Sequence, residues 1–224
     1  MTQRICLIHA VQVAMAPIEA SFKRLWPEAE RMNLLEDRLA ADRKPGELSA
    51  DMYRRFDTLA DYAISVGADG ILYTCSAFGP AIESVQHRLQ VPVFKPNEAM
   101  FTGALKRGRR IGMIATFLPS LQPMVDELRE MAVKQNIDVS IATACADGAQ
   151  PILMAGDAQR HHEMVAGQVK NLKDCDVILL AQFSMAGARA AVEAATTLPV
   201  LTSPDSAVQA IRAAVEQKQK TTAR

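Results

Sequence analysis

The sequence predicts an α/β protein made of two pseudo-symmetric lobes, each a parallel sheet flanked by helices, with the active site in the cleft between them. Three observations point to this fold class. Short apolar runs alternate with amphipathic stretches along the chain, the pattern recurs after about 107 residues, and 49% of the 224 residues are hydrophobic against 22% charged. Strand–helix alternation is typical of a parallel sheet covered by helices, and this apolar content excludes a disordered chain.

The individual elements follow from the position of the apolar residues. Runs that we expect to form strands buried on both faces lie at residues 5–10, 70–74, 111–115, 139–142, 177–181 and 200–202. Amphipathic stretches that we expect to form helices include residues 52–66, 81–89, 121–135 and 161–172. Gly67 follows the first of these stretches and is a plausible helix stop, since glycine adopts the left-handed conformation that ends many helices.

The segment 31–53 does not fit the alternation, because it is charged and poor in β-branched residues. We expect a loop–helix–turn excursion near the mouth of the cleft. It could form a lid, a wall beside the substrate, a subunit interface or an ordinary solvated surface.

An internal repeat defines the two lobes. A shift of 107 places the run that begins at Asp69 on the run that begins at Asp176, and places Pro92 on Pro199. We expect lobe 1 to comprise residues 1–100 plus 206–224, and lobe 2 to comprise residues 101–205. Each half is small for a separate domain, so we expect the two to pack face to face. The alternative is that all α/β units look alike.

Composition excludes several classes of function. Lys and Arg number 25 and Asp and Glu 25, so the net charge is zero and a dedicated nucleic-acid binder is not expected. No apolar run reaches the roughly 18 residues of a membrane span, and the N-terminus leads directly into an apolar run, so we expect no membrane partner and a cytoplasmic location. Since the four cysteines are widely spaced and no Gly-x-Gly-x-x-Gly motif follows a strand, we expect no metal and no cofactor.

Ligands of open α/β sheets bind beyond the carboxyl ends of the strands, so the residues that follow each strand are the candidate site residues. In lobe 1 they are His9, Thr74, Cys75, Ser76 and Ala77; in lobe 2 they are Thr116, Phe117, Gln182, Phe183 and Ser184.

Cys75 is the strongest catalytic candidate among them. It stands between a buried strand and a helix that begins near Pro80. A helix N-terminus carries partial positive charge, which is expected to lower the pKa of the thiol, and its backbone N–H groups can hold a carboxylate. Such a thiol can move protons at the carbon alpha to that carboxylate. The alternative is a buried structural cysteine.

The motif Thr74-Cys75-Ser76, after a Gly-Ala-Asp-Gly-Ile-Leu strand, resembles the first cysteine motif of the aspartate/glutamate racemase superfamily. This superfamily includes aspartate, glutamate and hydantoin racemases, maleate isomerase and arylmalonate decarboxylase. The resemblance extends over the repeat, the stretch 156–161 and the strand that begins at Asp176. It implies two α/β lobes, cofactor-independent chemistry in the cleft, a small carboxylic-acid substrate and a homo-oligomer, as a dimer or larger.

The racemases of this superfamily use two cysteines, one per lobe, and the sequence departs from them at the second. The repeat places Gln182 where the family has that cysteine, and an amide has no titratable proton, although it can hydrogen-bond a carboxylate or an enolate oxygen. Cys175 precedes its strand and cannot replace the missing thiol. Cys145 follows a strand and could approach from the side, whereas Cys6 is expected in the core.

The resemblance also suggests substrate contacts. Thr116 matches a position that offers a hydroxyl to the substrate carboxylate, and Ser76 and Ser184 could do the same, although each could instead cap a helix. His9 could orient the substrate or adjust the protonation of Cys75, or it could be structural. We expect His161 and its neighbours to lie at the surface, with His161 as the one possible cleft contact.

We therefore expect an isomerase of the racemase type that transfers protons at the carbon alpha to a carboxylate, with Cys75 as acid or base. Because one thiol is missing, the alternatives are a single-thiol decarboxylase of a malonate-like acid, which would be a lyase, and a non-catalytic protein that binds small acids.

Overall fold

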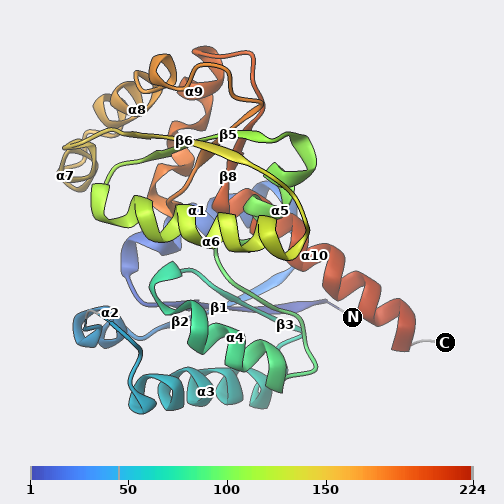
Figure 1. Ribbon diagram of the computed structural model, residues 1–224. Coiled ribbons are helices and arrows are strands. Elements are labelled where there is room, and N and C mark those ends of the chain that lie inside the picture. The colour runs from blue at the N-terminus through green and yellow to red at the C-terminus, as the bar shows by residue number, and fades with distance from the viewer. Residues whose placement is uncertain (1, 45, 223–224) are drawn as a thin grey trace. The chain divides into compact units, whose positions relative to one another are not determined.

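The apolar runs of the sequence form two separate parallel sheets in the computed structural model, which describes residues 2–44 and 46–222 (Figure 1). Within the described residues, each sheet has four strands, in the order β2-β1-β3-β4 in the first and β6-β5-β7-β8 in the second. The chain divides into two compact units: unit 1 is Met1–Ala99 with Ala207–Arg224, and unit 2 is Met100–Ser206. The α/β class with two parallel, helix-flanked sheets is confirmed.

Unit 1 contains the strands β1 (Arg4–His9), β2 (Glu30–Leu35), β3 (Gly70–Tyr73) and β4 (Val93–Phe94). Its helices are α1 (Met15–Leu25), α2 (Arg38–Asp42), α3 (Ala50–Ser65) and α4 (Gly79–Arg88), with the 3₁₀ turns η1 (Gln12–Ala14) and η2 (Ser76–Phe78). The helix α10 (Ser203–Thr222) starts in unit 2 and packs its later turns on β3: a Cβ added to Gly70 would lie 3.1 Å from Val215 and 3.2 Å from Ile211.

Alternation along β1 distributes its side chains to two faces of the sheet of unit 1. Cys6 and Ile8 belong to a core cluster that also contains Phe56 of α3 and Val85 of α4. Helices α3 and α4 therefore cover that face. Fully burying one such aliphatic side chain contributes about 1.5–3 kcal/mol.

Unit 2 contains the strands β5 (Arg110–Ala115), β6 (Ser140–Cys145), β7 (Val177–Leu180) and β8 (Val200–Thr202). Its helices are α5 (Glu98–Arg107), α6 (Leu121–Lys134), α7 (Ala149–Met154), α8 (Ala158–Ala166) and α9 (Arg189–Ala194), with the 3₁₀ turns η3 (Leu118–Ser120), η4 (Val169–Asn171) and η5 (Phe183–Ala188). Helices α5 and α6 share a core with one face of β5 and β7, and α8 and α9 share a core with the other.

In both sheets an aspartate side chain accepts a hydrogen bond from the first residue of a central strand. In unit 1 the Arg4 backbone N–H donates to Asp69 Oδ2 over 2.8 Å, and in unit 2 the Arg110 N–H donates to Asp176 Oδ2 over 2.9 Å. The guanidinium of Arg110 also donates to Asp176 Oδ1, and these bonds lower the pKa of that carboxyl. Each aspartate thus fixes a central strand at equivalent points of the two sheets.

The prediction for residues 31–53 was wrong in its first part. Residues 30–35 form β2, which pairs in parallel with β1 from Arg4↔Glu30 to His9↔Leu35. The strand lies at the edge of the sheet, where side chains need not be apolar, so Glu30 and Asn33 are exposed and the segment lacks the composition of a buried strand. The predicted helix stop at Gly67 is confirmed, with φ +81° directly after α3 and its C-cap.

Among residues 2–44 and 46–222, none of the helices combines the length and the apolarity that crossing a bilayer requires.

Candidate active site

Cys75 lies at the carboxyl end of the central part of the unit 1 sheet. It is the second residue after β3 and the N-cap of η2, with extended backbone torsions of φ −127° and ψ 122°. A proline in the first turn of α4 fixes the start of the helix that follows. The sequence prediction placed a thiol between a buried strand and a helix, and the structure has that arrangement, with a 3₁₀ turn between the two.

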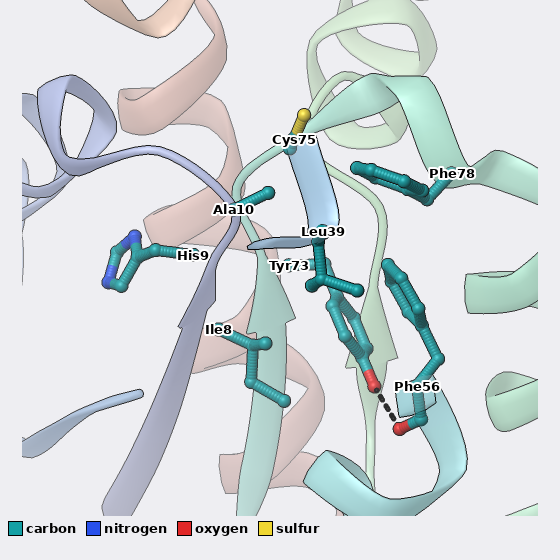
Figure 2. Close-up of a pocket in the computed structure, with 8 residues that line it drawn as sticks. All are labelled: Ile8, His9, Ala10, Leu39, Phe56, Tyr73, Cys75 and Phe78. Carbon is teal, nitrogen blue, oxygen red and sulfur yellow. Dashed lines mark hydrogen bonds between the residues drawn. The ribbon is translucent and has the colours of Figure 1, made fainter. Parts of the chain in front are cut away.

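Aromatic rings lie below the Cys75 position (Figure 2). The ring of Phe56 has its centroid 5.1 Å from those of Tyr73 and Phe78, and the Tyr73 hydroxyl donates to the Phe56 carbonyl over 3.2 Å. In Figure 2 the sulfur points away from these rings. The surrounding space is too narrow for a water molecule and is lined by Ile8, His9, Ala10, Leu39, Phe56, Tyr73, Cys75 and Phe78.

This environment reverses one prediction about Cys75. Burial raises the pKa of the thiol, and the backbone of Ala77 in the following turn lowers it by less. The helix N-terminus therefore acts in the expected direction, but desolvation of the thiolate is the larger effect. Cys75 is half-buried and keeps its proton at neutral pH.

His9 and Thr74 lie beside Cys75 on neighbouring strands. His9 ends β1 and is fully buried, and its Nδ1 lies 2.9 Å from Thr74 Oγ1. Its Nε2 lies 2.9 Å from Asn33 Oδ1. Burial lowers the pKa of His9, although Asn33 and Glu19 act in the opposite direction. Figure 2 shows the imidazole pointing away from the sulfur, so His9 does not contact the thiol directly.

The second half of the segment 31–53 lies against the Cys75 turn. Leu39 of α2 is 1% exposed and lines the same narrow space as the thiol. Arg43, which follows α2, donates from Nε to the Ala77 carbonyl over 3.2 Å. Residues 39–43 of this segment therefore lie next to the turn that carries Cys75.

Gln182 has the corresponding place in unit 2. It follows β7 by two positions and is the N-cap of η5, with φ −128° and ψ 142°. Its side-chain Oε1 accepts from the backbone N–H of Thr116 over 2.7 Å and from the Thr116 hydroxyl over 2.9 Å. A backbone N–H can only donate, so the amide oxygen must face Thr116, and the NH₂ group remains as the donor that Gln182 presents elsewhere.

The other predicted site residues also follow the carboxyl ends of strands within their own units, and their side chains differ in exposure to solvent. In unit 1, Ser76 and Ala77 are exposed within η2. In unit 2, Phe117 is 51% exposed after β5, whereas Phe183 is 7% exposed and packs inward. Ser184 is half-buried within η5. The Phe183 side chain is therefore mostly hidden from solvent.

The remaining cysteines differ in their access to the strand ends. Cys6 is fully buried within β1, and burial raises the pKa of its thiol to about 12, as expected of a core residue. Cys175 is buried before β7. Cys145 is half-buried at the last position of β6, where burial and Asp147 raise its pKa.

His161 was predicted to lie at the surface, and this was wrong. It is fully buried on α8, and within the described part of the chain neither ring nitrogen has a hydrogen-bond partner. Its pKa is lowered by burial and by His162, whose ring centroid lies 5.3 Å away. The helix α8, which carries His161, packs against η5, the turn that has Gln182 as its N-cap.

Two side chains of this region were missed by the sequence analysis. Asn33 bonds to His9, and Glu19 of α1 bonds to Asn33. Neither residue belongs to a recognisable motif. Asn33 also lies in the strand that was predicted as an excursion. No group of three or more His, Cys, Asp or Glu side chains that could hold a metal occurs among residues 2–44 and 46–222.

Comparison with known proteins places these strand ends in context. The family model described as Asp/Glu/Hydantoin racemase matches residues 20–211. Among curated proteins, none matches the sequence.

Solved structures share the fold at low sequence identity. Glutamate racemase from Thermus thermophilus is 21% identical with a TM-score of 0.69, over 97% of this chain and 82% of that one. Allantoin racemase from Klebsiella pneumoniae is 16% identical with a TM-score of 0.72, over 97% and 89%. A mutant of arylmalonate decarboxylase is 16% identical with a TM-score of 0.70, over 95% and 93%.

Proposed function

Because the chain belongs to the Asp/Glu/hydantoin racemase family, we propose that it is a cofactor-independent enzyme that transfers a proton at the carbon alpha to a carboxylate, with Cys75 as the reacting group. The observation that carries this proposal is the thiol at the junction of β3 and η2, half-buried above an aromatic stack. Its substrate is a small carboxylic acid, whose carboxylate the backbone N–H groups of η2 can hold.

The elevated pKa of Cys75 favours the role of acid. A protonated thiol gives its S–H proton to a carbanion or enediolate, and the resulting thiolate then takes a proton from solvent. To act as base, the thiol would first have to lose its proton, which burial opposes. Proton delivery is therefore the easier half of the chemistry for this residue.

Gln182 argues for a single-thiol reaction. Its amide cannot give or take a proton at working pH, and its oxygen is already engaged by Thr116. The NH₂ group can stabilise an anionic oxygen by donating a hydrogen bond. A symmetric exchange between two thiols therefore lacks its second member at position 182.

A decarboxylase is the second candidate, and Gln182 is the specific observation that favours it. In this reaction the bond to a carboxylate carbon breaks, carbon dioxide leaves, and the electron pair remains on an enediolate. The Cys75 thiol then protonates the alpha carbon from one side. This needs one acid and no base. A non-catalytic protein that binds small acids is the third possibility, and it predicts neither exchange nor gas release.

The test is solvent deuterium exchange at the alpha carbon over a panel of amino acids, hydantoins and 2-substituted malonates. We expect exchange or carbon dioxide release with native protein, loss of both in Cys75→Ala, and retention in the control Cys145→Ala. Activity that survives Cys75→Ala would overturn the assignment of the reacting group. Racemisation that rises in Gln182→Cys while decarboxylation is absent would favour the isomerase over the lyase.

A further inference from the structure

A row of four polar side chains crosses three strands of the unit 1 sheet and leads to the residue before Cys75. Glu19 of α1 accepts from Asn33 Nδ2 over 3.0 Å, and Asn33 Oδ1 lies 2.9 Å from His9 Nε2. His9 Nδ1 lies 2.9 Å from Thr74 Oγ1. The strand register makes this row possible, because Leu7 pairs with Asn33 and His9 is two residues further along the same face of β1.

The chemistry of the groups gives each bond one direction. An ionised carboxylate only accepts, so Asn33 donates its NH₂ to Glu19 and turns its oxygen toward His9. That oxygen also only accepts, so the His9 proton resides on Nε2. In the neutral ring, which burial favours, the Nδ1 atom then carries a lone pair and accepts from the Thr74 hydroxyl, whereas in a charged ring Nδ1 would donate instead.

The outer end of the row is held by charge. Arg31 Nε donates to Glu19 Oε2 over 3.0 Å, and Arg31 also donates to the Ala29 carbonyl over 2.8 Å. The Glu19 and Arg31 side chains are 29% and 21% exposed, so both are largely withdrawn from solvent. Glu19 carries the negative charge of the row and is paired with Arg31. Glu19 still acts to raise the pKa of His9, but burial of the imidazole lowers it by more.

The inner end of the row fixes a hydroxyl. Thr74 is 5% exposed, and its alternative acceptor, the Ile8 carbonyl, lies at a longer 3.4 Å. Its backbone N–H donates to the same carbonyl over 3.0 Å, which extends the pairing of β1 and β3 by one residue. Thr74 is therefore held through both its backbone and its side chain, immediately before the N-cap thiol.

We infer that Glu19, Asn33 and His9 are positioning residues. Glu19 and Asn33 fix the proton of a neutral His9 on Nε2, so that its Nδ1 accepts from the Thr74 hydroxyl. His9 thereby holds Thr74 and, through it, the peptide that carries Cys75. His9 acts through Thr74, since its ring points away from the sulfur in Figure 2. The inference rests on the proposed function only in taking Cys75 as the reacting group. It explains why a neutral, fully buried histidine ends the strand next to β3.

The tautomer can be measured without any substrate. Nitrogen-15 spectra of the imidazoles separate Nε2–H, Nδ1–H and charged rings, and the four histidines are few enough to assign His9 with His9→Gln. We expect native His9 to be neutral with its proton on Nε2 at pH 7.5, because burial lowers the pKa of the imidazole. In Asn33→Leu we expect a mixture of tautomers, and in Asn33→Asp a charged ring, because a carboxylate stabilises the imidazolium.

The positioning of Cys75 has its own readout, namely its rate of alkylation by iodoacetamide, followed by mass spectrometry of the peptide that contains it. We expect Asn33→Leu and Thr74→Val to change this rate about threefold or more in the same direction, because both remove the bond that orients Thr74. Thr74→Ser keeps the hydroxyl and should restore the native rate. Asn171→Leu, in exposed η4 of unit 2, serves as the control.

A native spectrum with the proton on Nδ1, or an alkylation rate that is unchanged in both Asn33→Leu and Thr74→Val, would overturn the inference. Should Asn33→Leu fail to fold, the native spectrum and the Thr74 pair still decide the question. Neither measurement requires turnover. A protein with the expected tautomer and alkylation rates but no exchange and no gas release would refute the proposed function and leave the row of hydrogen bonds established.

Discussion

Replacement of Gln182 by leucine should destabilise unit 2, because one side-chain oxygen satisfies two donors. Gln182 Oε1 accepts from the Thr116 backbone N–H over 2.7 Å and from its hydroxyl over 2.9 Å. Thr116 is 3% exposed, so water cannot readily replace the lost acceptor. Leucine has a similar volume and removes the acceptor without adding charge.

The two donors are not equivalent in cost. The hydroxyl can rotate toward another acceptor, whereas the backbone N–H cannot turn. A buried donor left unsatisfied costs about 1–3 kcal/mol, so we expect a loss of about 1–3 kcal/mol from the N–H alone. For a chain of this length, that corresponds to a fall in Tm of roughly 2–12 °C.

The assay combines far-UV circular dichroism with amide hydrogen exchange. Circular dichroism gives the Tm of the whole chain, and exchange gives the protection of the Thr116 N–H. We expect a lower Tm and faster exchange at Thr116 in Gln182→Leu. Gln168→Leu is the matched control, because its side-chain oxygen accepts an exposed bond, from Asn171 over 3.0 Å, which water can replace. Native protection of Thr116 in Gln182→Leu, with a Tm equal to that of the control, would refute the reasoning.

Three further outcomes follow from packing and protonation. His161 is buried and has a lowered pKa, so below about pH 6.5 the unfolded chain binds more protons than the folded chain. The free energy of unfolding should therefore decrease as the pH falls, by up to about 1.4 kcal/mol per pH unit. Urea titrations at pH 7 and pH 5 should show a smaller decrease in His161→Leu. Gly108→Ala would place a Cβ 2.2 Å from the Asp176 side chain and should lower the Tm, whereas Gly103→Ala, with contacts of 3.4 Å or more, should leave it equal or higher. Phe56→Ala removes the ring from the stack below Cys75 and should cost about 3–5 kcal/mol in urea unfolding; an effect below 1 kcal/mol would contradict the packing.

The buried strands could be predicted from sequence because their composition reflects burial on both faces. The residues 111–115 are all apolar or glycine, and they lie within β5, between α6 on one side and α8 on the other. The edge strand β2 has no such signature, because it contains Glu30, Arg31 and Asn33, whereas the edge strands β6 and β8 carry apolar runs and were recognised. β2 was missed for this reason, and with it the contact of Asn33 with His9, since a polar side chain on an unrecognised strand has no predictable neighbour.

The position of Cys75 after a strand could be predicted from the local sequence, whereas the direction of its pKa shift could not. Position depends on local order: a strand, a short polar run and a helix. The shift depends on burial, and residues distant in sequence, such as Phe56 of α3, line the same narrow space as the thiol. Similarly, the burial of His161 depends on η5 packing against α8, and a Cβ on Gly187 of η5 would lie 2.9 Å from His162 Nε2. Such close approaches leave no pattern in the sequence around the histidines.

Cys75 and Gln182 have the same backbone conformation at equivalent positions of the two units, but their side chains differ in chemistry. Their φ angles are −127° and −128°, and each is the N-cap of a 3₁₀ turn beyond a central strand, so the two units present a side chain in the same way. In unit 1 this side chain is a thiol that keeps its proton above a ring stack; in unit 2 it is an amide whose oxygen is bound by Thr116. A thiol donates and then recovers a proton, whereas the amide only donates a hydrogen bond. Equivalent positions of the two units therefore differ in chemistry: Cys75 can exchange a proton, whereas Gln182 can only donate a hydrogen bond.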